Sequence, residues 1–529
     1  MSQEQPAYEY EKRHLVLGLI AIFLVYGTMA SYIQMLNIAR PKIAAVLNGM
    51  AIYAWSVSIA GVVSAFVTLL FGKLSDLYGR RIMLLLSILF ALTGMVLSAL
   101  STNFIFFIFA SAVASLGTGA MMPLVFAVVG DMFPPVARSK WIGWLNAPMG
   151  IAALIGPTLG GWFSDNWGWQ YVFWILVPLL CLCFILVWIG LPPLSQRSDK
   201  PKIDFQGSLL VTVASSLLII GISLGGVTYP WASIHIVGLL CASLLFWILF
   251  FTAEFRAKEP VLDPLVLRNR SFNTIALVTL LSSFGSIEIM MYFPMFLQGV
   301  QGTSATLSGQ IITPFSMLMA FFGIPVGYLI ARTRRYKWLY VLGFAILTAD
   351  MFGILLIGND TPIYWSVIAA ALAGIGLGAV PTVNTIVVQT VVPKRLLGAA
   401  MGAMFFCLMI GVAVCPAILG AAMNATYAKA LASSLPNGLE RVADKETMTY
   451  LTDSRVLLSE PEMNALQKAF NRLGNEGQEL FQQTVISIRA SMGVGCRSIF
   501  LIGAMTMLIS FLLIITIPEI RIGDEPEQE

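Results

Sequence analysis

A charged turn between two long apolar runs organises this sequence: Gly72-Lys73-Leu74-Ser75-Asp76-Leu77-Tyr78-Gly79-Arg80-Arg81. Gly72 and Gly79 permit backbone angles and close helix approaches that a side chain would forbid. Asp76 is an anion that a helix N-terminus or an arginine could hold, and Arg80 and Arg81 favour the cytoplasmic face of a membrane. The turn therefore predicts two membrane helices joined on the cytoplasmic side.

The composition indicates a polytopic membrane protein. Of the 529 residues, 58% are hydrophobic and 11% are charged, which is too apolar for a water-soluble domain with a polar surface. The net charge of +4 is too slight to predict binding to nucleic acid. His14 and His235 lie far apart in sequence, and the six cysteines lie in apolar runs, where they pack as small hydrophobes. We therefore expect a lipid bilayer as the environment, with no metal, no cofactor and no disulfide framework.

Fourteen apolar windows of about 20 residues are candidate transmembrane helices. They lie near 14–36, 50–71, 82–101, 104–130, 138–163, 169–191, 207–224, 234–253, 272–297, 309–331, 337–357, 363–389, 396–422 and 494–517. Lys and Arg concentrate in alternate loops, and five of the seven outer loops contain neither. This pattern predicts a multi-pass protein of the cell (inner) membrane with both termini in the cytoplasm.

The charged turn resembles a family signature. The positions that match, one by one, the loop between the second and third helices of the major facilitator superfamily are Gly72, Leu74, Asp76, Gly79, Arg80 and Arg81. Asn37, Ala39 and Pro41 resemble the first-helix signature of its fourteen-helix drug:proton antiporter branch. The resemblance covers nearly the whole chain. It implies an all-α major facilitator fold with two six-helix halves, two inserted helices and fourteen transmembrane helices.

An internal repeat supports the two halves. Gly117-x-Gly119-Ala120 precedes Phe133-Pro134 with the spacing by which Gly376-x-Gly378-Ala379 precedes Val392-Pro393, an offset of 259 residues (Gly117 to Gly376). The charged turn returns only in part, as Gly327-Tyr328-Leu329 leading to Arg332, Arg334 and Arg335 without the aspartate. We predict an N-terminal half at 1–191, a linker with the two inserted helices at 192–271, and a C-terminal half at 272–529.

The fifth span is rich in small residues. It contains Gly156, Pro157, Gly160 and Gly161, and it resembles the antiporter motif of the superfamily with Ala152 in place of one glycine. Small residues four apart let two helix backbones meet closely, and Pro157 frees a backbone carbonyl and allows a kink. We expect a gate helix, and plain helix packing without antiport is the alternative.

Polar residues end the first span, where Gln34, Asn37 and Arg40 are expected to face a cavity. Two positions differ from the antiporter branch. Tyr32 stands where the branch carries an aspartate, and Val113 stands where it carries an arginine. An uncoupled or differently coupled carrier of a metabolite or lipid is therefore an alternative to a proton antiporter.

Acids inside membrane spans are costly, so each is a candidate for proton coupling or substrate binding. Glu288 and Asp350 lie well inside spans, and Asp131 lies near an inner end. At about 1.5 Å per residue, Glu288 and Asp350 both fall in the outer half of the bilayer. The resemblance implies that the span of Glu288 lines the cavity and that the span of Asp350 is a supporting helix. We therefore expect coupling at Glu288 and a hydrogen-bonded structural acid at Asp350; for Glu288, a wet residue at the outer mouth is the alternative.

Residues 423–490 are too polar to cross a bilayer. Ser459-Glu460-Pro461-Glu462 resembles a helix capping box. The apolar residues that follow it on one helical face, up to Gly474, are Met463, Leu466, Phe470 and Leu473. We expect an outer helical hairpin that covers the transporter mouth, and docking of an accessory envelope protein is the alternative.

No Walker loop, nucleophile elbow or zinc-spaced His-Glu pair is present, so we do not expect an enzyme. The resemblance implies a secondary active transporter that exports amphipathic organic compounds or drugs by alternating access, in exchange for protons. We expect Asp76 to hold the gate on the inner side by pairing with Arg138 or with a helix N-terminus of the other half. The alternative from another class is a non-transporting receptor or scaffold that docks through the outer hairpin.

Overall fold

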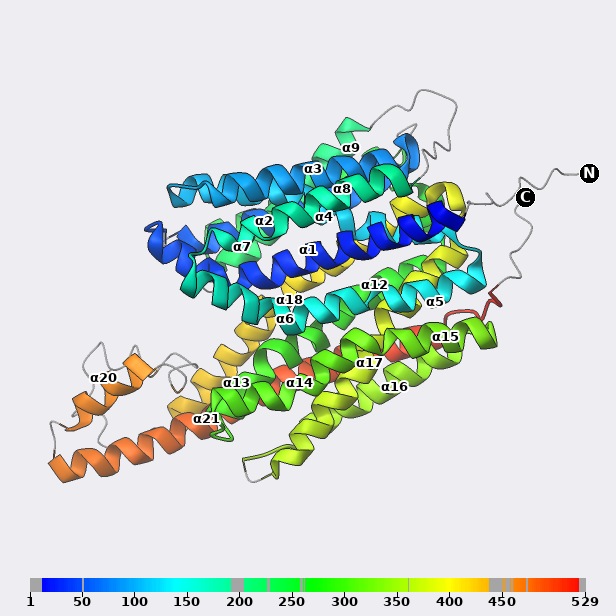
Figure 1. Cartoon of the computed structure of the whole chain (residues 1–529). Coiled ribbons are helices and arrows are strands. Elements are labelled where there is room, and N and C mark those ends of the chain that lie inside the picture. The colour runs from blue at the N-terminus through cyan, green and yellow to red at the C-terminus, as the bar shows by residue number, and fades with distance from the viewer. Residues whose placement is uncertain are drawn as a thin grey trace, which may run out of the picture.

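The computed structural model describes residues 12–49, 52–191, 204–225, 229–256, 260, 262–359, 361–436, 451, 457, 460–471 and 474–522. Across these ranges the chain is helical, apart from one isolated bridge between Gly225 and Tyr229. Figure 1 shows long helices lying side by side in a bundle. Twelve of the helices described are long and apolar enough to cross a membrane, and one bent pair makes a thirteenth. The expected all-α membrane fold is confirmed.

The first half of the chain forms six predicted spans. Its helices are α1 (Lys12–Val46), α2 (Tyr53–Tyr78), α3 (Arg80–Ala99), α4 (Phe104–Met132), α5 (Pro135–Leu145), α6 (Ala147–Asn166), α7 (Tyr171–Trp174) and α8 (Leu176–Gly190). Helix α3 packs between α4 and α8, and α1 packs between α6 and α8. The fifth span is divided into α5 and α6, and the sixth into α7 and α8.

The second half repeats this arrangement. Its helices are α11 (Pro264–Arg268), α12 (Arg270–Ile287), η2 (Glu288–Tyr292), α13 (Phe293–Gly299), α14 (Ala305–Phe321), α15 (Gly323–Thr333), α16 (Lys337–Ile354), α17 (Ile363–Val391), η3 (Lys394–Leu396), α18 (Leu397–Ser434) and α21 (Gly474–Ile515). The ninth span is continuous through α12, the π-helical segment η2 and α13. Helix α16 packs between α17 and α21, as α3 packs between α4 and α8.

The inserted pair lies beside the seam between the halves. Helices α9 (Phe205–Leu224) and α10 (Ile234–Glu254) pack on each other, and α9 also contacts α2 and α18. The Trp247 ring of α10 lies 5.9 Å from the Phe406 ring of α18. Helix occupies all fourteen predicted windows, but in α9 the apolar stretch that is described, Gln206–Ile222, is shorter than the other spans.

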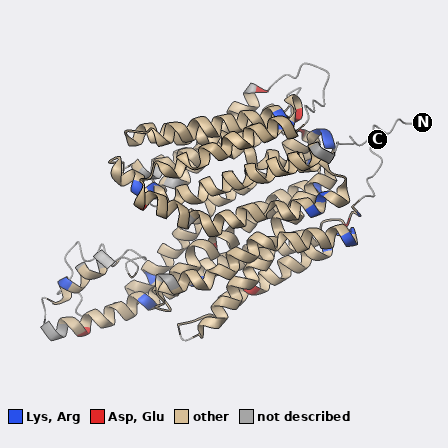
Figure 2. Ribbon diagram, viewed as in Figure 1, with Lys and Arg blue, Asp and Glu red and all other residues tan. Residues whose placement is uncertain are grey.

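The two ends of the bundle differ in charge. Figure 2 shows Lys and Arg at both ends of the bundle, and the described residues near the joint of α2 and α3 and the turn after α15 include more of them than the opposite end does. We call this end, where α2 meets α3, the inner end, and the end that carries α20 (Glu460–Asn471) the outer end.

A helical projection extends from the outer end (Figure 1). Helix α18 continues to Ser434, past the predicted limit at 422, and α21 begins at Gly474, before the predicted start at 494. Helix α20 packs on α21 through Phe470, whose ring lies 5.6 Å from that of Phe481. Gly474 therefore starts the next helix, while Ser459 and Leu473 lie outside the described residues.

Candidate functional site

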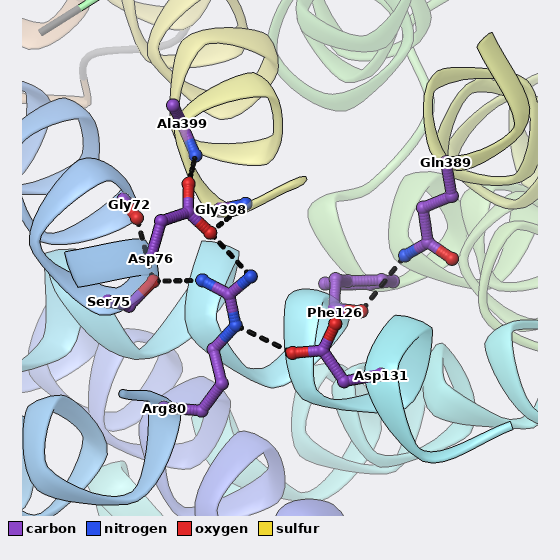
Figure 3. Close-up of polar contacts among 9 residues, drawn as sticks. All are labelled: Gly72, Ser75, Asp76, Arg80, Phe126, Asp131, Gln389, Gly398 and Ala399. Carbon is purple, nitrogen blue, oxygen red and sulfur yellow. Dashed lines mark hydrogen bonds and ion pairs between the residues drawn. The ribbon is translucent and has the colours of Figure 1, made fainter. Parts of the chain in front are cut away.

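Asp76 joins the two halves at the inner end. It lies near the end of α2, and its side chain is 3% exposed. Its two carboxylate oxygens accept hydrogen bonds from the backbone N–H groups of Gly398, at 2.9 Å, and Ala399, at 2.7 Å (Figure 3). These amides open α18, where helix geometry leaves donors unpaired and the helix dipole is positive. Of the two expected partners, the helix N-terminus is the one that the structure shows.

Arg80 connects Asp76 to a second acid. Its Nη2 lies 2.5 Å from Asp76 Oδ1, and its Nε donates to Asp131 Oδ2 at 2.8 Å (Figure 3). Nη1 donates to the Ser75 hydroxyl. Ser75, Asp76 and Arg80 are buried, and the Asp131 side chain is 7% exposed. All four belong to the N-terminal half, and Asp131 forms an ion pair in this network.

Arg138 makes a separate tie between the halves. Its Nη1 donates to the backbone carbonyl of Gln389, near the end of α17, at 3.3 Å, and its Nε donates to the Phe133 carbonyl at 3.3 Å. A cation suits the negative end of a helix. Nε2 of the Gln389 side chain donates a hydrogen bond to the Phe126 carbonyl at 2.9 Å, which also joins the two halves (Figure 3). Arg138 thus holds α17, whereas Arg80 and the start of α18 hold Asp76.

Glycines let the halves approach closely at two crossings. A Cβ on Gly72 would lie 2.5 Å from the Gly398 carbonyl oxygen, and one on Gly327 would lie 2.4 Å from the Ser139 carbonyl oxygen. The partners are related by the repeat, since Ser139 and Gly398 are also 259 residues apart. Helix α2 on α18 and α15 on α5 are therefore equivalent crossings, and together they bring the two halves into contact at the inner end.

Gly79 and Arg81 complete the turn. Gly79 joins α2 to α3 with a φ of 91°, a region that favours glycine. The chain turns there so that Arg80, the first residue of α3, reaches back to Asp76. Arg81 lies over the ring of Trp188 on α8, 4.7 Å from its centroid.

The expected gate helix packs on α1. A Cβ on Gly156 would lie 2.7 Å from Cβ of Gln34, and one on Gly160 would lie 2.8 Å from Cα of Met35; Gly161 has more room. The segments Pro135–Gly156 and Thr158–Asn166 meet at 40°, with Pro157 between them. The kink and the close packing are present, and the gating role stays a prediction.

The polar residues of the first span face different surroundings. Gln34 is half-buried against Gly156, Asn37 is exposed, and Arg40 is buried. Tyr32 is also buried, with its ring 6.3 Å from that of Phe173 on α7. The structure does not bring these three polar residues together with Asp76.

Glu288 and Asp350 are buried acids of the second half. Glu288 is fully buried at the start of η2 and Asp350 is buried in α16, and both elements pack on α21. The Glu288 carboxylate lies against α21, where a Cβ on Gly503 would be 1.5 Å from Oε2. Neither Glu288 oxygen has a hydrogen-bond partner among the described residues. Asp350 Oδ2 has no hydrogen-bond partner among them either, and the structural role of Asp350 stays a prediction.

Three groups of this site were not predicted from the sequence. These are the amides of Gly398 and Ala399, the carbonyl of Gln389, and the space left by Gly503. For Gly398 a signal exists, because the repeat offset relates it to Ser139 beside Arg138.

The chain is similar to known membrane transporters. The family model described as Major Facilitator Superfamily matches residues 18–416. The multidrug transporter protein MdtP of Bacillus subtilis is 29% identical over 435 residues, covering 82% of this chain and 80% of that protein. Multidrug resistance protein 3 of the same organism is 31% identical over 376 residues, covering 70% of this chain and 72% of that protein.

Solved structures share the fold. The human organic anion transporter MFSD10 (TETRAN) has a TM-score of 0.59 at 14% identity, covering 94% of this chain and 99% of that one. The proton:xylose symporter XylE has a TM-score of 0.59 at 11% identity, covering 96% and 97%. At these identities the likeness concerns the fold alone.

Proposed function

Since this chain belongs to the major facilitator superfamily, we propose that it exports amphipathic organic compounds, drugs among them, in exchange for protons by alternating access. It is a multi-pass membrane transporter with a small-molecule substrate. The names of its relatives, two multidrug proteins of Bacillus subtilis and the efflux pump dotC of Dothistroma septosporum, support efflux. The larger number of cations at the inner end supports a cell (inner) membrane with both termini in the cytoplasm.

The contact of Asp76 with α18 carries this proposal. Alternating access needs contacts that close one end of the transporter and can break without leaving a buried charge alone. When the halves separate at the inner end, Asp76 loses the amides of Gly398 and Ala399 but keeps Arg80, which belongs to its own half. Each hydrogen bond to a charged group contributes about 1.5–3 kcal/mol, so the contact of Asp76 with α18 holds the halves together but can break and form again.

The burial of Glu288 supports proton exchange. Its carboxyl group is fully buried and neither oxygen has a hydrogen-bond partner among the described residues, so ionising it there is costly. Glu288 therefore holds a proton while its site is dry and releases it when water reaches the site. Glu288 begins a π-helical segment, a feature frequent at functional sites, and this irregular backbone suits a conformational change there.

Transport by Glu288→Gln in proteoliposomes tests the coupling. We expect ethidium accumulation driven by a pH gradient to be lost, because the amide cannot titrate, while ethidium exchange without a gradient partly survives. Glu479→Gln is the matched control, since Glu479 is exposed on the outer part of α21. If Glu288→Gln keeps full pH-driven transport, proton coupling would have to be assigned to Asp350 or Asp131 instead.

An uncoupled or differently coupled carrier of a metabolite or lipid is the second candidate. Tyr32 and Val113 favour it, because they stand where the antiporter branch carries charged groups. Ethidium uptake by the wild-type protein that does not respond to a pH gradient would support this candidate and remove proton exchange.

A further inference from the structure

A basic pocket lies at the inner end, apart from the residues of the proposed transport mechanism. It measures about 590 Å³ and is lined by Thr333, Arg334, Arg335, Trp338 and Arg521. We propose that this pocket binds the phosphate headgroup of an anionic phospholipid from the membrane leaflet at the inner end.

The pocket forms because the end of the chain folds back onto the turn between α15 and α16. Arg334 ends α15 in the left-handed conformation, with a φ of 55°. Its carbonyl accepts a hydrogen bond from Ile522 N–H at 3.1 Å, and the Tyr336 hydroxyl donates to the Pro518 carbonyl at 2.6 Å. These two bonds place Arg521 beside the arginines of the turn.

The repeat explains why these cations remain available. Gly327 makes the crossing that Gly72 makes in the first half, and in this register Arg335 corresponds to Arg80 and Ala331 to Asp76. The position 259 residues after Asp131 is Thr390. Arg335 has therefore lost both of the acids that hold Arg80.

Among the described residues, one acid forms an ion pair with the cluster. Glu519 Oε1 is 4.0 Å from Arg335 Nε, and both side chains are well exposed, at 39% and 52%. Surface pairs of this kind are weak, with a median of about 0–1 kcal/mol. In the part of the chain that the structure describes, three arginines against one paired carboxylate give the pocket an excess of positive charge.

The surroundings select a lipid rather than a soluble phosphate. Guanidinium groups bind phosphate oxygens through paired N–H donors, and basic pockets between membrane helices on the cytoplasmic side fit anionic headgroups. Trp338 is 42% exposed in the first turn of α16, which suits the membrane interface. Leu342, one turn further, is 48% exposed on the same helix face, so an acyl chain can lie along α16 below the headgroup.

Lipid binding to the purified full-length protein in neutral detergent tests the proposal. The probes are dioctanoyl phosphatidylglycerol, dioctanoyl phosphatidylcholine and inorganic phosphate, measured by native mass spectrometry. We expect preference for phosphatidylglycerol, and a loss of affinity of about tenfold to thirtyfold in Arg335→Ala/Arg521→Ala. Arg335→Ala alone should show a smaller loss while both bonds that hold the C-terminal segment stay in place.

Arg332→Ala is the matched control, because Arg332 is an exposed cation in the last turn of α15 that does not line the pocket. Equal binding of both lipids, or an equal loss in Arg332→Ala, would overturn the proposal. Displacement of phosphatidylglycerol by inorganic phosphate at equal concentration would assign the pocket to soluble phosphates instead. If phosphatidylglycerol binds only to a chain shortened to end at Ile522, the pocket would be assigned to the acidic residues that follow Ile522. That result would also overturn the proposal.

Discussion

Asp76 performs two tasks with one carboxylate. Each oxygen accepts a backbone N–H from the start of α18, and Arg80 balances the charge from within the same half. An isolated buried anion would be too costly, and a neutral side chain would hold the helix weakly. The residue thus combines a helix cap across the halves with an ion pair inside one half.

The substitution Asp76→Asn tests this combination. The amide keeps one acceptor oxygen but presents an NH2 group to the second backbone N–H, and Arg80 loses one of its two acids. We expect normal membrane insertion and ethidium transport reduced about tenfold or more, measured in inverted vesicles, because about 1.5–3 kcal/mol of hydrogen bonding is lost.

Asp165→Asn provides the comparison at the outer end. Asp165 pairs with Lys42 at 2.8 Å, but its side chain is 73% exposed, so its loss should leave transport within twofold. A well-inserted Asp76→Asn protein with wild-type transport would show that the cap does not matter for the cycle.

At the scale of the helices, the two halves meet at the inner end through two equivalent crossings of small residues. In a membrane, apolar side chains gain little by leaving lipid, so helices associate where backbones can touch. Gly402 supports α2 on α18, and Gly143, 259 residues earlier, supports α15 on α5. The two crossings are therefore equivalent contacts between the halves, related by the internal repeat.

Gly72→Ala tests how tight the crossing of α2 on α18 is. The new methyl group would lie 2.5 Å from the Gly398 carbonyl oxygen, so α2 and α18 must move apart. We expect slower ethidium transport and a lower midpoint of thermal unfolding in detergent, for a cost of about 1–3 kcal/mol. Gly61→Ala is the control on the same helix, since its added Cβ has nothing within 4 Å. Equal behaviour of the two variants would contradict a tight crossing.

The whole molecule is asymmetric in two places despite its repeat. The inserted pair lies beside the seam of α2 and α18, where Trp247 meets Phe406. The outer projection of α18, α20 and α21 belongs to the second half alone (Figure 1). Tyr427 of α18 supports it by donating to the Leu451 carbonyl at 2.9 Å.

Replacing residues 436–485 by a short Gly-Ser linker tests the role of the projection. The two helices already meet there, since Ser487 Oγ donates to the Ser434 carbonyl at 2.7 Å. We expect transport to persist, because the two crossings at the inner end are untouched. Loss of binding to an accessory protein, with no transport in either form, would instead support a scaffold that docks through this element.

The sequence by itself determined the class of fold and the position of the inner turn. Hydropathy is enough to place membrane helices, because a span needs only length and apolar side chains. Gly72, Asp76 and Gly79 were predicted to lie at a charged joint, and the internal offset predicted two six-helix halves. The paired glycine crossings were seen only in the structure.

The tertiary structure alone decided which groups meet. Asp76 is held by backbone amides of Gly398 and Ala399, and a backbone amide has no signature in a sequence. Glu288 was expected to lie in a cavity-lining span, and the structure places its carboxylate against α21, in the space that Gly503 leaves. Such contacts depend on how helices distant in the chain are rotated and seated, and apolar periodicity does not record this in a bilayer whose lipid is as apolar as the protein.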